Sequence, residues 1–122
     1  MRKLMNMKGL KMLKKLTEKY ISAFNKKDIN EVANLLNENF VLEDPVVKRI
    51  EGKEECLKAI ENIFKNCNKL SFSAKNIFQD KNITFIEFIL ILDDIRLEGV
   101  DIIEWHDEKI VELRAYLDIP KG

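Results

Sequence analysis

Histidine and cysteine, two common metal-binding side chains, are scarce in this sequence. His106 is the only histidine, and Cys56 and Cys67 are the only cysteines. A zinc site needs more of these ligands at closer spacing. The sequence therefore predicts no metal site of histidine or cysteine. We expect both cysteines to be reduced thiols, with Cys56 in the core.

The sequence also lacks a net charge and any long apolar run. Its 21 Lys and Arg residues balance 21 Asp and Glu residues, so no overall field draws the chain to nucleic acid or an anionic membrane. The most apolar stretch, residues 85–92, is too short to span a bilayer. The basic start has no apolar run typical of a signal peptide. We therefore expect a cytoplasmic protein that binds neither nucleic acid nor membranes.

One domain is expected from 122 residues, of which 46% are hydrophobic and 34% charged. A chain of this length buries about two thirds of its unfolded surface, and we find no linker or repeat that divides it. The predicted domain spans residues 1–122, with a frayed or disordered start at residues 1–9.

Three amphipathic helices are predicted in the first half of the chain. An apolar stripe at spacings of three and four residues predicts the first helix over residues 10–25. The stripe consists of Leu13, Leu16, Tyr20 and Phe24. Asp28 and Glu31 have the spacing of a capping box, which predicts a short helix through Leu36 and a turn after it. The third helix is predicted over residues 53–65.

Alternation of apolar and polar residues predicts strands in the rest of the chain. A short strand over residues 40–44 ends at Pro45, and a loop continues to Gly52. Four long strands joined by hairpins are expected over residues 70–78, 83–92, 97–105 and 111–119. The predicted class is α+β, with three helices packed on one face of a curved antiparallel sheet. Apolar residues on both faces of strand 83–92 predict that a partner covers the outer face.

The same alternation assigns side chains to the faces of the strands. Phe72 and Phe78 are predicted on one face of the first long strand, and Val111 and Leu113 on one face of the last. Asp101 is the only charged residue on a face that it shares with Leu97, Gly99, Ile103 and Trp105.

Three polar groups interrupt the apolar pattern: Tyr20 on the helical stripe, Asp44 at a strand end, and Asp101. A carboxyl group in an apolar site tends to stay protonated, so that it can donate a hydrogen bond, as can a tyrosine hydroxyl. Two such donors form an oxyanion hole, and a nearby ionised aspartate can move a proton. Each residue also has a structural interpretation: Asp44 as a turn residue, Tyr20 as a core residue with its hydroxyl at the surface, and Asp101 bonded to backbone at a bulge.

The order of these features resembles the nuclear transport factor 2-like superfamily, and within it the SnoaL-like proteins and ketosteroid isomerases. The matching features are Tyr20, Asp28, Leu42-Glu43-Asp44-Pro45, Gly52 and the ending at residues 110–118. The resemblance covers about residues 13–119. It implies a cone-shaped α+β barrel with a deep pocket between the helices and the concave sheet, commonly in a homodimer. It also implies that Asp44 is a general base and that Tyr20 and Asp101 are oxyanion donors, with Asp101 a neutral acid.

The pocket is expected to bind a small apolar molecule. Its predicted lining is Phe24, Phe40, Phe72, Phe88, Ile103, Trp105, Ala115, Leu117 and Glu87; Glu87 could instead pair with Arg96 or Arg114. Two functions remain open. One is a cofactor-free isomerase, cyclase or dehydratase that acts on an apolar carbonyl compound. The other is a non-catalytic ligand-binding or dimerisation module, which a pocket filled by Phe40, Phe72 and Phe88 would favour.

Overall fold

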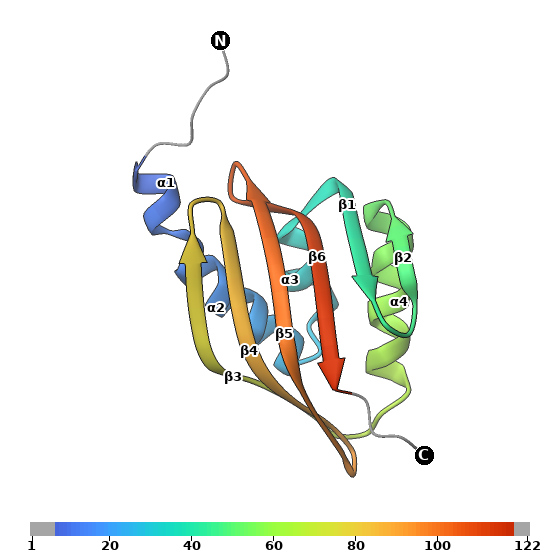
Figure 1. Ribbon diagram of the computed structural model, residues 1–122. Helices are drawn as coiled ribbons and strands as arrows, with labels where there is room; N and C mark the ends of the chain where they lie inside the picture. Colours follow the sequence, from blue (N-terminus) through green and yellow to red (C-terminus); the bar gives the residue numbers. More distant parts are fainter. Residues whose placement is uncertain (1–6, 119–122) are drawn as a thin grey trace.

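The computed structural model describes residues 7–118 and shows helices on one side of a curved sheet (Figure 1). The helices are α1 (Met7–Lys11), α2 (Leu13–Asn25), α3 (Ile29–Asn34) and α4 (Lys53–Lys65). The first predicted helix is therefore two helices that meet at Met12. The predicted start at residues 1–9 lies mostly outside the described residues, and its last three residues belong to α1.

Six strands form one sheet with the order β2-β1-β6-β5-β4-β3. They are β1 (Leu36–Asp44), β2 (Lys48–Glu51), β3 (Leu70–Asp80), β4 (Ile83–Leu92), β5 (Ile95–His106) and β6 (Lys109–Asp118). The α+β class and the packing of the helices on one face are as predicted. The sheet is mixed, however, because β1 runs parallel to β6. Strand β2, predicted as loop, pairs with β1 at the edge of the sheet.

The segment after α3 differs from its prediction. The side chain of Asp28 accepts a hydrogen bond from the Glu31 amide at 3.1 Å, so the expected cap is present. The helix nevertheless ends at Asn34, and β1 begins at Leu36 in place of the predicted turn. Pairing with β6 explains this early start, since Leu36 lies opposite Ile110.

Two irregularities in the sheet overturn two predicted face assignments. The β3–β4 register shifts between Ala74 and Asn76, so Phe78 lies opposite Phe85 on the outer face and is 53% exposed. A second shift lies between Glu104 and Trp105, and it pairs Trp105 with Ile110. Ile110 is therefore fully buried and Val111 is not. A one-residue bulge changes which side chains of a strand face the core.

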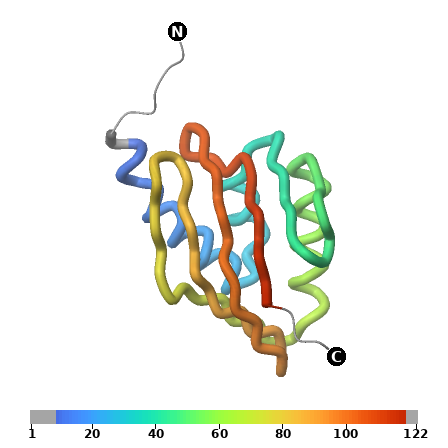
Figure 2. Tube along the Cα trace, in the orientation of Figure 1, coloured from blue at the N-terminus to red at the C-terminus, as the bar shows by residue number. Residues whose placement is uncertain are grey.

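The core lies between the inner face of the sheet and helices α2, α3 and α4, which lie behind the sheet in Figure 2. A buried polar chain fixes α2 on the sheet. The Trp105 indole N–H donates to the Thr84 hydroxyl at 2.9 Å, and that hydroxyl lies 2.8 Å from the hydroxyl of Thr17. The Thr17 hydroxyl also reaches the Leu13 carbonyl oxygen at 2.7 Å. Because these groups are hydrogen bonded, their burial is not costly.

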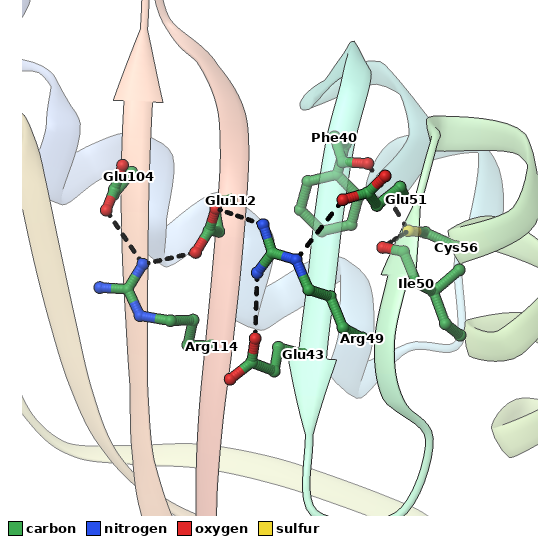
Figure 3. Close-up of polar contacts among 9 residues, drawn as sticks. All are labelled: Phe40, Glu43, Arg49, Ile50, Glu51, Cys56, Glu104, Glu112 and Arg114. Carbon is green, nitrogen blue, oxygen red and sulfur yellow. Dashed lines mark hydrogen bonds and ion pairs between the residues drawn. The ribbon is translucent and has the colours of Figure 1, made fainter.

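A ladder of charged side chains crosses the outer face of the sheet from β5 to β2 (Figure 3). The Arg114 guanidinium lies 3.0 Å from Glu104 and 2.7 Å from Glu112. Arg49 lies 3.0 Å from Glu43 and 3.5 Å from Glu112. Hydrogen bonds to Glu112 and Glu104 raise the pKa of Arg114. The ladder alternates in sign, and its carboxylates outnumber its two guanidinium groups, so it carries a net negative charge.

Candidate functional site

A partly enclosed cavity of about 80 Å³ lies between the inner face of the sheet and helices α2 and α4. Apolar side chains form its wall except at three positions, which are Tyr20, Asp44 and Asp101. The apolar lining consists of Phe24, Phe40, Leu42, Ile60, Ile63, Phe72, Phe88, Leu90, Leu113, Ala115 and Leu117. One cavity thus brings together the three polar residues that the sequence singles out.

Tyr20 enters the cavity from the apolar stripe of α2 and is only 4% exposed. Its ring packs on Phe24, with centroids 5.9 Å apart, and edge-on against Phe72 at 6.2 Å. Burial, and secondly the charge of Asp101, raise the pKa of Tyr20 well above its usual range. The phenol is therefore neutral at physiological pH and can donate a hydrogen bond.

Asp101 lies on β5 between Ile86 of β4 and Ala115 of β6, and is 4% exposed. Burial raises the pKa of this carboxyl to about 8, with a further contribution from the charge of Asp44. At pH 7 the group is thus mostly protonated. The small side chain of Ala115 leaves space beside the carboxyl. Asp101 can therefore act as a second neutral donor.

The polar atoms of Tyr20 and Asp101 point to open space. Neither side chain is hydrogen bonded to another residue in the described part of the chain. Within that part, every fully enclosed side-chain nitrogen or oxygen has a partner. The hydroxyl and the carboxyl must therefore reach the cavity. The sheet has no register shift at Gly99 or Asp101, which removes the interpretation of Asp101 as a bulge residue bonded to backbone.

Asp44 is held at the end of β1 by the turn that follows it. One carboxylate oxygen, Oδ1, accepts hydrogen bonds from the amides of Val46 at 2.8 Å and Val47 at 2.7 Å. This is the geometry of a turn-starting aspartate. The other oxygen, Oδ2, has no hydrogen bond within residues 7–118. The turn therefore orients Asp44 and leaves one oxygen available at the edge of the cavity.

Six of the nine predicted lining residues line this cavity, and three lie elsewhere. Trp105 and Ile103 are buried in the core, where the Trp105 indole is bonded to Thr84. Glu87 lies on the outer face of β4, because Ile86 and Phe88 on either side of it face the core. Its carboxylate accepts a hydrogen bond at 2.8 Å from the side chain of Asn76. These three residues therefore do not line this cavity.

Sequence reasoning missed five lining residues: Leu42, Ile60, Ile63, Leu90 and Leu113. The spacing of Ile60 and Ile63 is helical, and alternation places Leu113 on one face of the last strand, whereas Leu42 and Leu90 stand in apolar runs to which alternation assigns no face. Neither signal shows which core residues border empty space. That depends on how α4 lies against β1.

Four phenylalanine rings, those of Phe24, Phe40, Phe72 and Phe88, crowd the cavity. The Phe72 ring lies 5.0 Å from Phe24 and 5.2 Å from Phe88, measured between centroids. Phe24 also packs edge-on against Phe64 at 5.0 Å, outside the lining. Such contacts are favourable and hold the rings in place. The cavity is therefore both lined by the three polar groups and narrowed by phenylalanine.

Features of other kinds of site are not found in the described residues. Within residues 7–118, no three side chains of His, Cys, Asp or Glu are grouped as metal ligands. No helix in the same part of the chain has the length and apolar character needed to cross a membrane.

The sequence profile of the SnoaL-like domain matches residues 17–113. No curated protein matches the chain.

Several solved structures share the fold. A candidate isomerase of Bacillus subtilis is 25% identical, with a TM-score of 0.77 over 93% of this chain and 90% of its own. A candidate ketosteroid isomerase of Kribbella flavida is 22% identical, with a TM-score of 0.80 over 93% of this chain and 82% of its own. An LEH-like epoxide hydrolase from M. tuberculosis is 20% identical, with a TM-score of 0.72 over 85% of this chain and 80% of its own.

Proposed function

The chain belongs to the SnoaL-like domain family, and from this premise we propose that it binds a small apolar carbonyl compound and catalyses a proton transfer on it. The observation that supports the proposal is the composition of the cavity wall. Two neutral hydrogen-bond donors and one carboxylate interrupt an otherwise apolar lining. An isomerase, a cyclase or a dehydratase without a cofactor could use this set.

The proposed reaction begins with a carbonyl oxygen placed between Tyr20 and Asp101. Asp44 takes the proton from the carbon next to the carbonyl, and the electron pair of the broken C–H bond moves onto the oxygen. Both donors then bind an oxygen that carries negative charge, which lowers the barrier. In an isomerase, Asp44 returns the proton to another carbon of the same molecule. No atom or electron is gained or lost.

The rival proposal is a binding or dimerisation module with the same cavity. The crowding by Phe24, Phe40, Phe72 and Phe88 favours it, because these rings fill space that a substrate would need. In this proposal Tyr20 and Asp101 only orient a bound molecule.

A homodimer through the outer face of the sheet is part of both proposals. Phe78 and Tyr116 are 53% and 56% exposed, and the apolar residues Phe85 and Ile102 lie between their strands. A second copy would bury this apolar surface, and the charges of the ladder could pair across the interface. Light scattering should give twice the mass of one chain for the wild type, and a monomer for Tyr116→Glu.

Binding of 4-nitrophenol tests the oxyanion site, because its phenolate absorbs visible light and resembles an enolate. We expect the wild type to bind the phenolate and to lower the pKa of the bound phenol. Tyr20→Phe and Asp101→Asn should each weaken binding at least tenfold. Tyr116→Phe and Asp94→Asn make the same chemical changes at exposed positions, so they should bind like the wild type. Equal binding by all five proteins would contradict the proposal.

A further inference from the structure

We propose that Phe88 sets the upper size of the ligand, and that the ligand is a compact carbonyl compound with no more than one ring. The carbonyl group of the ligand rests on the proposed function of the cavity. The limit on the size of the ligand rests on the shape of the cavity. Fused-ring compounds, steroids included, are excluded by the same geometry.

The position of the Phe88 ring depends on Gly99. The two residues are cross-strand partners on β4 and β5. A Cβ atom at Gly99 would lie 3.0 Å from Cζ of Phe88 and 2.1 Å from the Tyr116 carbonyl oxygen. The Tyr116 carbonyl oxygen is what requires glycine here, and the missing side chain also lets the tip of the Phe88 ring lie over β5 without being displaced. Strand glycines often permit such a close approach of an aromatic ring.

From this position the Phe88 ring closes one side of the cavity near the donors. Gly99 is two residues from Asp101 on the same face of β5. The Phe88–Gly99 pair is therefore the neighbour, on that face, of the Ile86–Asp101 pair, and the tip of the Phe88 ring lies next to the Asp101 position. The ring is fully buried and packs on Phe72. It thus takes space beside Asp101 that a second ring of a ligand would require.

The volume that remains is small. The cavity of about 80 Å³ is about half of the roughly 150 Å³ that holds benzene in an engineered apolar cavity. It is also well below the roughly 300–1,000 Å³ of most drug-sized pockets. Asp44, Ile63, Ala115 and Leu117 are the half-buried lining residues and mark the open end. A single-ring ligand can bind with its carbonyl group inside and its far edge at this opening.

Phe88 can be truncated without direct loss of a contact to the Tyr20 ring. Phe24 and Phe72 both pack on that ring, whereas Phe72 is the one aromatic partner of Phe88 among residues 7–118. Phe88→Ala should therefore enlarge the cavity and leave the phenol in place. Phe64→Ala is the matched control, because Phe64 is also a buried phenylalanine but does not line the cavity.

Toluene and naphthalene test the effect of ligand size alone, because neither has a polar group and they differ by one ring. We expect calorimetry or NMR titration to show that the wild type binds toluene, and binds naphthalene at least tenfold more weakly. Phe88→Ala should bind naphthalene at least tenfold more tightly than the wild type does, and Phe64→Ala should not. If Phe88→Ala does not fold, Phe88→Leu makes a smaller opening in the same place and should shift the toluene-to-naphthalene ratio in the same direction.

Three results would overturn the inference: equal affinity of the wild type for both hydrocarbons, no gain in Phe88→Ala or Phe88→Leu, or no binding of either hydrocarbon to any of these proteins. Failure of the proposed function looks different. In that case 4-nitrophenol would bind no better than nitrobenzene, which lacks the hydroxyl, while toluene and naphthalene would still be discriminated by size.

Discussion

Asp101 and Glu112 show how the two faces of one sheet give a carboxyl group opposite properties. Asp101 lies on the inner face of β5, where burial, and secondly the charge of Asp44, raise its pKa to about 8. Glu112 lies on the outer face of the neighbouring strand β6, where hydrogen bonding to Arg114 lowers its pKa. The inner carboxyl is an acid that can donate a hydrogen bond at pH 7, and the outer one is an anion at that pH.

The difference arises from what each face packs against. Apolar side chains of α2 and the sheet surround Asp101, and no cation lies among the cavity's lining residues. On the outer face, arginines and glutamates from β1, β2, β5 and β6 alternate in contact with water. The inner face therefore suits chemistry on a small molecule, and the outer face suits an interaction between protein surfaces.

The largest effect is expected from Asp101→Asn on the pH dependence of stability. The carboxyl has a pKa of about 8 in the folded state and about 3.9 when unfolded. Below pH 4 it is neutral in both states. Between pH 4 and 8 only the unfolded state ionises, so the wild type loses stability as the pH rises. At pH 7 this loss amounts to about 4 kcal/mol.

Urea unfolding of the wild type and Asp101→Asn at pH 4, 5, 6, 7 and 8 measures this difference directly. The variant should gain stability over the wild type across that range, and the gain should level off above pH 8. Asp94→Asn, at an exposed turn, should follow the wild type. Parallel curves for the wild type and Asp101→Asn would show that the Asp101 carboxyl ionises normally in the folded protein.

The next effect is expected on catalysis. If Asp44 is the base, Asp44→Asn should slow exchange of the α-protons of a one-ring ketone in heavy water by about a hundredfold or more. Tyr20→Phe should lose about a hundredfold because one oxyanion donor is removed. NMR follows the loss of the α-proton signal. Arg114→Met, on the outer face, should exchange at the wild-type rate; exchange that is equal in all four proteins would exclude a catalytic role for the inner face.

Thr84→Val should produce a smaller effect, on the free energy of unfolding. The change leaves the Trp105 indole N–H and the Thr17 hydroxyl without their partner on β4. The Thr17 hydroxyl keeps its hydrogen bond to the Leu13 carbonyl oxygen, so only the indole N–H is left unpaired, at a cost of about 1–3 kcal/mol. In Trp105→Phe the indole donor is already absent, so adding Thr84→Val should cost less than it does in the wild type. Additive losses in chemical denaturation would show that the three groups do not act as a network.

The inner face was more predictable from sequence than the outer face. The helical stripe placed Tyr20 in the core, and the alternation in β5 did the same for Asp101. In each case the periodicity of a single element is enough to assign the side chain to a face. The rotation of Phe78 to the outer face was not predictable, since it follows from a one-residue bulge in β3. The parallel pairing of β1 with β6 joins segments about 70 residues apart, and no local pattern records it. The face of Glu87 also has no local signal in the sequence, because it depends on which side of β4 the helices cover.

The smallest effect is expected from Arg114→Met on the outer face. Arg114 lies 2.7 Å from Glu112 and 3.0 Å from Glu104, but its side chain is 24% exposed and water screens the charges. Partly exposed ion pairs of this kind contribute about 0–1 kcal/mol, and methionine keeps most of the apolar stem of arginine. The free energy of unfolding should therefore fall by less than about 1 kcal/mol at low salt, and the loss should shrink in 1 M sodium chloride. A larger loss that salt does not reduce would mean that the ladder is shielded from water, as it would be if a second copy covered this face. In that case both faces of the sheet would be buried. Asp101 and Glu112 would then differ only because Glu112 has an arginine partner and Asp101 has none among the described residues.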